Sequence, residues 1–236
     1  MNNEIVVERL FETLIKGDRE ATRAIVQETI GARIPAETLS QEVYWKLLEM
    51  IISLYRADQL STVAHHYATR LLRSLIDQVQ ARYTTKPSRG RSILTFSGPS
   101  EADELAGQLV ADLAEADGYE VCFGGGGVAG DEILAEVGQR RPDVLLMFSS
   151  APADAPQIRQ VIDSIRTIGA CPDVQIVVGG GVFSRADGLA EEIGADLWAS
   201  DPAQLLERLT LEPNRRATSD QRTVGRHRRS GSKSAA

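Results

Sequence analysis

Residues 175–183 read QIVVGGGVF, a short run rich in β-branched side chains that ends in three consecutive glycines. Comparable apolar runs occur at 93–96, 120–123, 144–148 and 197–199, and amphipathic stretches near 102–117, 131–140, 155–168, 184–193 and 202–211 alternate with them. Short strands that alternate with helices are typical of a parallel sheet covered by helices on both faces. We therefore expect residues 92–212 to form an α/β domain with a five-stranded, doubly wound parallel sheet.

The first 84 residues show a different periodicity. Apolar side chains recur at helical spacing in the first segment, as at Val7, Leu10 and Leu14. Gly17-Asp18 interrupts this pattern, and further helices are expected near 19–30, 39–55 and 62–83. Four helices with short connections predict a helical bundle over residues 1–84. Residues 85–91 contain proline, glycine and cations, which indicates an interdomain linker.

The charge is distributed unevenly along the chain. Residues 213–236 carry seven Lys or Arg and one Asp, a net +6, so the preceding 212 residues sum to −13 within the total of −7. Because it is almost without apolar residues, this segment predicts a disordered basic tail. The acidic body repels phosphate, so a weak nucleic-acid contact would come from the tail. A solvated terminus without a partner is the alternative.

The remaining composition excludes several classes of protein. No apolar run approaches the roughly 20 residues that span a membrane, and the first residues do not resemble a signal peptide. Cys122 and Cys171 have no metal-binding spacing. We therefore expect a cytoplasmic protein without a membrane segment or a structural zinc site.

Ligands of doubly wound sheets bind beyond the carboxyl ends of the strands. One loop at this edge, residues 125–130, reads GGGVAG and matches the GxGxxG pattern of dinucleotide sites. The next strand ends in Ser149-Ser150 rather than in the acid that would hold a ribose, which favours a flexible loop instead. The glycines at 179–181 would let the backbone approach a planar ligand closely, or would form a tight turn without one.

Histidine is the most informative residue type. The chain has His65, His66 and His227, so residues 92–212 contain none. The side chains of adjacent helical residues diverge by about 100°, so His65 and His66 cannot both face one ligand directly. One reading is a packed histidine beside a solvated one, and the other is a histidine directed at a cofactor held by the second domain.

Together, the bundle, the linker and the α/β domain resemble the cobalamin-binding family over about residues 5–212. This family implies a Rossmann-like (flavodoxin-like) sheet below a helical cap. Its light-sensing members place a Trp, nine residues, Glu-His and then Ala-Thr over the upper face of the corrin. Here Tyr55 is followed by nine residues, His65-His66 and Ala68-Thr69. The resemblance implies upper-face contacts from Tyr55, His65, His66 and Thr69, with His66, or else His65, as a candidate cobalt ligand.

In the α/β half, Gly179, Gly180 and Gly181 resemble the glycine turn of the family, and residues 194–196 and 199–201, which include Ser200, resemble the strand after it. Ser149 and Ser150 resemble the region that contacts the nucleotide tail. Ser97 and Gly98 belong to the first loop, which in this family precedes a DxHxxG motif.

That motif is where the chain departs from the family. Anchored on Gly107, the motif positions hold Ala102 in place of Asp and Glu104 in place of His. A carboxylate is a poor replacement for imidazole on cobalt, and the carboxylate that would orient the ligand is missing too. Methyl transfer through a His-ligated cobalt is therefore not expected.

Three functions follow from this resemblance. The first is a sensor or regulatory protein that holds adenosyl- or methylcobalamin without a lower-face His and signals to a protein partner or a second copy. The second is a regulatory module of the same fold that binds haem or no cofactor. An enzyme, either a corrinoid methyl carrier or a dinucleotide oxidoreductase, ranks last.

Overall fold

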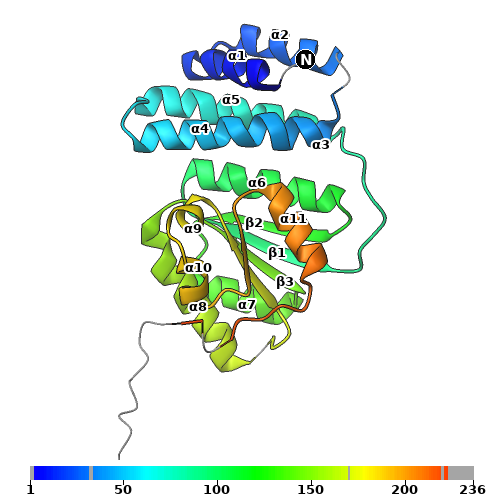
Figure 1. Cartoon of the computed structure of the whole chain (residues 1–236), viewed down its shortest axis with the longest axis vertical. Helices are drawn as coiled ribbons and strands as arrows, with labels where there is room; N and C mark the ends of the chain where they lie inside the picture. The colour runs from blue at the N-terminus through cyan, green and yellow to red at the C-terminus, as the bar shows by residue number, and fades with distance from the viewer. Residues whose placement is uncertain (1–2, 32–33, 170, 219–220, 223–236) are drawn as a thin grey trace, which may run out of the picture.

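The computed structural model describes residues 3–31, 34–169, 171–218 and 221–222 (Figure 1). The amino-terminal part is helical, as predicted, and the third predicted helix is a continuous rod of two α segments with a π-helical stretch between them. Gly17, at φ +70°, ends the first helix, and the Asp18 carboxylate caps the second by accepting from the backbone N–H of Ala21 at 3.0 Å. The elements are α1 (Asn3–Lys16), α2 (Arg19–Gly31), α3 (Ala36–Leu39), η1 (Ser40–Tyr44), α4 (Trp45–Arg56) and α5 (Thr62–Gln80).

The second part is a five-stranded parallel sheet in the order β2-β1-β3-β4-β5, which confirms the doubly wound fold class. The direction of winding reverses between β1 and β3, so ligand sites are expected at the carboxyl ends of these two strands. The strands are β1 (Ser92–Ser97), β2 (Glu120–Gly126), β3 (Val144–Phe148), β4 (Gln175–Gly179) and β5 (Leu197–Ala199).

Helices cover both faces of the sheet. α6 (Glu101–Ala116) and α11 (Pro202–Leu211) lie on the face toward the bundle, while α7 (Gly130–Arg140) and α8 (Ala155–Ile168) cover the opposite face (Figure 1). The single helix predicted near 184–193 is wrong. Two short helices, α9 (Gly181–Arg185) and α10 (Leu189–Ile193), replace it, because Gly188 turns the chain at φ +78°.

The two faces of the sheet belong to two hydrophobic cores. Leu146 and Phe148 of β3 point to the α6 side, and Leu145 and Met147 point to the α8 side, as the alternation of a strand requires. The first core runs without interruption from the bundle through α6 and α11 to the sheet. Both domains therefore share one core, with α6 as the layer between them.

The start of the basic tail is packed against the α/β domain. Ala217 donates its backbone N–H to Asp196 Oδ1 at 2.6 Å, and Arg222 bonds to Asp163 Oδ1 and to the carbonyl of Ile193. The prediction of disorder from residue 213 onward is therefore wrong for 213–218 and 221–222, because backbone and guanidinium donors find acceptors on the domain. Residues 219–220 and 223–236 lie outside the described residues.

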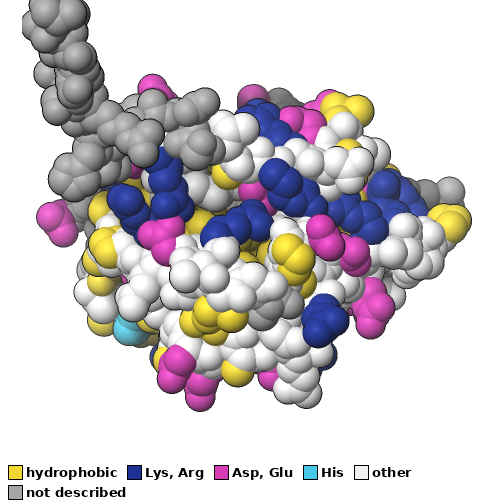
Figure 2. Space-filling view, turned by 90° about the horizontal axis from the view of Figure 1, so that it is seen from below, with side chains coloured by type: hydrophobic (Ala, Val, Ile, Leu, Met, Phe, Trp, Pro, Cys, Tyr) yellow, Lys and Arg dark blue, Asp and Glu magenta, His cyan; other side chains and the backbone are white. Residues whose placement is uncertain are grey.

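The face turned away from the bundle carries a band of Lys and Arg side chains with Asp and Glu between them (Figure 2). In the described part of the chain, no helix is long and apolar enough to cross a membrane.

Candidate functional site

A cavity of about 230 Å³ lies between α4 of the bundle and the carboxyl ends of β3, β4 and β5. Residues at regular spacing on one side of α4 form its roof, and the loops after the strands form its floor. The sequence-predicted residues Ser150, Gly181 and Ser200 line this cavity together. The roof residues are Trp45, Leu48, Glu49, Ile52, Ser53 and Arg56.

The inner end of this cavity is closed by two aromatic rings. Trp45 of α4 meets Phe148 of β3 edge-on, with ring centroids 6.0 Å apart at 84°. Between the sheet, α6 and α11, the cavity beside Leu146, Phe148 and Leu205 has a volume of only about 10 Å³. The apolar space beneath the strand ends is therefore filled by side chains of the protein itself.

Glu104, which the resemblance predicts to stand at the position of the family histidine, faces the bundle. Its Oε1 lies 3.7 Å from Arg73 Nη1 of α5, and Glu101 lies at the same distance from Arg70. Ala102 is buried beneath them. Gly107 is needed for close packing, because a Cβ there would meet the Phe123 ring at 3.0 Å. The first turn of α6 thus contributes two ion pairs that join the domains.

Asp103 lies on the other side of this turn and is fully buried. Its Oδ2 accepts from the Ser100 hydroxyl at 2.7 Å, while its Oδ1 has no partner among the described residues. Burial raises the pKa of Asp103, and the nearby Asp154 carboxylate adds to this rise, partly offset by the hydrogen bond from Ser100. Sequence analysis did not single out Asp103 or Asp154.

The two adjacent histidines lie at one end of the bundle. The His65 ring stacks on Tyr55 with centroids 4.1 Å apart and is buried, whereas His66 is exposed. Burial lowers the pKa of His65, and His66 adds to this effect. The Thr69 hydroxyl bonds to the backbone carbonyls of His65 and His66. None of these four residues lines the interdomain cavity.

The glycine turn after β4 is required by backbone packing. Gly180 has φ +102°, and a Cβ there would lie 2.2 Å from the carbonyl oxygen of Ser149. The backbone N–H of Ser149 donates to the carbonyl of Gly179 at 3.0 Å, so this turn and the loop after β3 touch directly. Tight packing alone therefore accounts for Gly180.

The remaining predicted residues have local roles. The Ser149 hydroxyl donates to Asp154 Oδ2 at 2.6 Å, and the carbonyl of Ser150 accepts from Arg185. The Ser200 hydroxyl donates to Asp201 at 2.7 Å. Ser97 ends β1 with its hydroxyl buried and unpaired within the described residues, and it is followed by Gly98.

These features define a class of protein: a doubly wound ligand-binding domain whose strand ends are roofed by a helical cap. Sequence models described as "B12 binding domain" match both parts of the chain, one over residues 91–207 and another over residues 6–80. The chain belongs to the cobalamin-binding family, and its two domains are the helical cap and the Rossmann-like domain of that family.

One solved structure supports this fold, and two others match with lower scores. The monomethylamine corrinoid protein of Methanosarcina barkeri superimposes with a TM-score of 0.69 at 16% identity, covering 87% of this chain and 97% of that chain. A cobalamin-binding protein from Desulfitobacterium hafniense DCB-2 matches at 15% identity over 86% of this chain and 96% of that one, with a TM-score of 0.47. The methanol:cobalamin methyltransferase complex of M. barkeri matches at 14% identity over 92% and 83%, with a TM-score of 0.49. No match was found among curated proteins.

The arrangement of residues does not fit a corrinoid held through a lower-face histidine. Residues 92–212 contain no histidine, and Glu104 pairs with Arg73 instead of facing the cavity. The cavity of about 230 Å³ is also smaller than the ~300–1,000 Å³ of pockets for drug-sized ligands. A macrocycle of corrinoid size could enter only if Trp45 and Phe148 moved apart.

Proposed function

We propose that this chain is a sensor or regulatory protein of the cobalamin-binding family that signals through the contact between its bundle and its α/β domain. The observation that carries this proposal is the Glu104–Arg73 ion pair, which uses the former ligand position to join the domains. Membership of the family is equally compatible with a corrinoid methyl carrier. A carrier, however, needs a tuned cobalt ligand, and this position supplies none.

The shared core supports a role that depends on two arrangements. Trp45 and Phe148 bury each other when the domains are in contact, and they would be exposed if the domains separated. A molecule that binds only the separated arrangement shifts the population toward it by its binding free energy. A corrinoid is the ligand that the family suggests for this role, and a protein partner or a second copy would read the change.

Corrinoid retention tests this proposal. The full chain is mixed with hydroxo-, methyl- or adenosylcobalamin and passed over a size-exclusion column, and the absorbance of the eluted protein is recorded. We expect Phe148→Ala to retain more corrinoid than the wild type, because it widens the space beside Trp45. Phe96→Ala is the matched control, since it removes the same ring on the opposite face of the sheet. If neither the wild type nor Phe148→Ala retains any corrinoid, the corrinoid part of the proposal is wrong.

A second variant tests the position of Glu104. We expect Glu104→His to give no cobalt–imidazole spectrum with aquacobinamide, a corrinoid that carries no nitrogen base of its own, because this side chain faces Arg73 of the bundle. A nitrogen-ligated cobalt spectrum that appears with Glu104→His and is absent in the wild type would contradict this geometry and favour a degenerate methyl carrier.

A module that binds haem or no cofactor is the second candidate. The small free volume between Leu146, Phe148 and Leu205, about 10 Å³, favours a module without a cofactor, because a ligand would have no room at that point. The buried His65 Nδ1, which has no partner among the described residues, favours haem. Haem titration of the wild type and of a His65→Ala/His66→Ala double variant distinguishes these two. An unchanged Soret band in the double variant excludes ligation by either histidine.

A further inference from the structure

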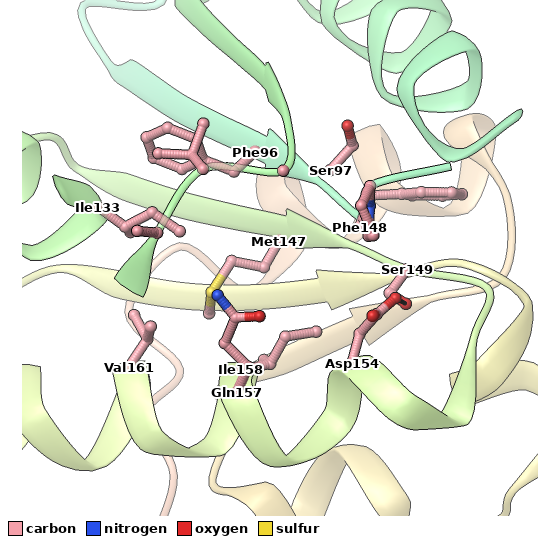
Figure 3. A pocket seen from close by; sticks show the side chains of 15 residues that line it. Phe96, Ser97, Ile133, Met147, Phe148, Ser149, Asp154, Gln157, Ile158 and Val161 are labelled. Carbon is pink, nitrogen blue, oxygen red and sulfur yellow. Dashed lines mark hydrogen bonds between the residues drawn. The ribbon is translucent and has the colours of Figure 1, made fainter. Parts of the chain in front are cut away.

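A second cavity, of about 240 Å³, lies on the face of the sheet opposite the bundle, between β1, β3, α7 and α8. Its wall combines apolar and polar side chains, and Figure 3 shows Phe96, Met147, Ile133, Ile158 and Val161 around it with the amide of Gln157 beside Met147. α7 and α8 lie on the face of the sheet turned away from the bundle (Figure 1), and Phe148 at the end of β3 lines both this cavity and the interdomain cavity. Phe148 is thus shared with the proposed regulatory contact, whereas Ile133, Ile158 and Asp154 line only this second cavity.

The rim of this cavity is built by two loops, one after β1 at the winding reversal and one after the neighbouring strand β2. One loop is Ser97–Pro99, and the other is the glycine-rich segment Gly127–Ala129. A Cβ on Gly126 would lie 2.4 Å from the carbonyl oxygen of Gly98, so the loops touch at that point. This contact places the rim where doubly wound sheets bind their ligands, and it gives the glycine-rich segment a structural role without a dinucleotide.

The charge at the rim is negative. Asp154 lines the cavity, and only the Ser149 hydroxyl is seen to donate to its carboxylate within the described residues. The buried Asp103 lies nearby, and the negative charge of Asp154 contributes to the raised pKa of Asp103. The amino-terminal end of α7 contributes partial positive charge, which Asp131 and Glu132 in its first turn offset. The described lining contains no Lys or Arg.

The size of the cavity limits its ligand. An apolar cavity of about 150 Å³ holds benzene, so 240 Å³ accommodates a molecule of one or two rings. The apolar side chains of the wall favour the ring, and the Asp154 carboxylate favours a donor or a positive charge at one end. We propose that this cavity is a binding site for a small aromatic amine, with its ring between Met147 and Ile158 and its ammonium at Asp154.

Calorimetric titration of the full chain with three related probes tests this site. Tryptamine carries a ring and an ammonium, indole carries the ring alone, and indole-3-acetate carries a negative charge instead. We expect affinity to fall in the order tryptamine, indole, indole-3-acetate. Asp154→Asn should weaken tryptamine binding about tenfold, as expected for the loss of a charge-assisted hydrogen bond, and should change indole binding much less.

Two further variants locate the ring. Ile133→Phe fills the cavity and should weaken tryptamine and indole alike, whereas Ile168→Phe makes the same change at a side chain that is 65% exposed and should have no effect. Circular dichroism checks that each variant folds, and if Ile133→Phe does not, Asp154→Asn decides the question. The proposal is overturned if tryptamine does not bind, if indole-3-acetate binds best, or if Asp154→Asn leaves tryptamine affinity unchanged. None of these outcomes depends on whether a corrinoid binds.

Discussion

The contact between Trp45 and Phe148 can be measured directly with a double-mutant cycle. Leucine at either position removes the ring but keeps an apolar side chain, so the protein should remain folded. The edge-on geometry at 6.0 Å lies within the range in which aromatic pairs contribute about 0.5–1.5 kcal/mol beyond the area they bury. We therefore expect Trp45→Leu and Phe148→Leu to show a coupling free energy of this size.

Urea unfolding followed by circular dichroism is the assay. With a slope of about 2–3 kcal/mol/M, the coupling corresponds to a non-additive shift of about 0.2–0.7 M in the unfolding midpoint. Because the bundle and the α/β domain share one core, we also expect a single transition for the wild type.

A control cycle makes the result specific. Phe96 belongs to the core on the other face of the sheet, so Trp45→Leu and Phe96→Leu should be additive within about 0.5 kcal/mol. Additive effects for Trp45 and Phe148 as well, or separate transitions for the two domains, would refute the shared interface.

Three further predictions concern other parts of the molecule. Burial, with the charges of Glu115 and Asp77, raises the pKa of Asp112 to about 7, so the folded state binds this proton more tightly than the unfolded state and stability falls as pH rises from about 4 to 7. In thermal unfolding, Asp112→Asn should therefore stabilise the protein more at pH 8 than at pH 5. An equal effect at both pH values would contradict this prediction. Gly180→Ala should lower the free energy of unfolding by more than about 1 kcal/mol, because Gly180 has a positive φ and lies against the backbone of Ser149. Gly138→Ala, at an open position on α7, should be neutral or stabilising. Similar urea midpoints for the two variants would contradict this prediction. Truncation after Leu211 should lower the unfolding midpoint, because Gln175 loses its hydrogen bond to the Glu212 carbonyl and Asp196 loses its hydrogen bond from the Ala217 N–H. Truncation after Arg222 keeps both bonds and should leave the midpoint unchanged. Equal midpoints for the two truncations would mean that residues 212–222 do not stabilise the fold.

The fold was largely predictable because it depends on periodicity. Apolar runs of five and three residues predict β3 and β5 with the bounds that the structure gives. The helix expected near 184–193 was wrong because the local consequence of Gly188 was not recognised. The ordered start of the tail was missed because composition does not show that Asp196 offers an acceptor to Ala217.

The site was less predictable, because its main contacts join residues far apart in the chain. The family resemblance predicts that Glu104 stands where relatives carry a histidine, but it does not show that Arg73 is its partner. Likewise, burial of Phe148 follows from the strand pattern, whereas its contact with Trp45 depends on how the bundle sits on α6. The one indication of this contact in the sequence is the large size of the Trp45 and Phe148 side chains near the carboxyl ends of the strands, where a ligand would need space.

The position of α6 affects how the chain responds to cutting. The connection before β1 is exposed over residues 84–90, so a protease could cleave it without entering the core. Twelve of the sixteen residues of α6 are buried, and many lose that burial if the bundle leaves. A nicked chain should therefore remain assembled as two fragments that co-purify, and the α/β domain expressed alone should aggregate through the uncovered helix. The linker predicted at residues 85–91 therefore divides the chain in sequence, but it does not divide the folded protein into two independently stable units.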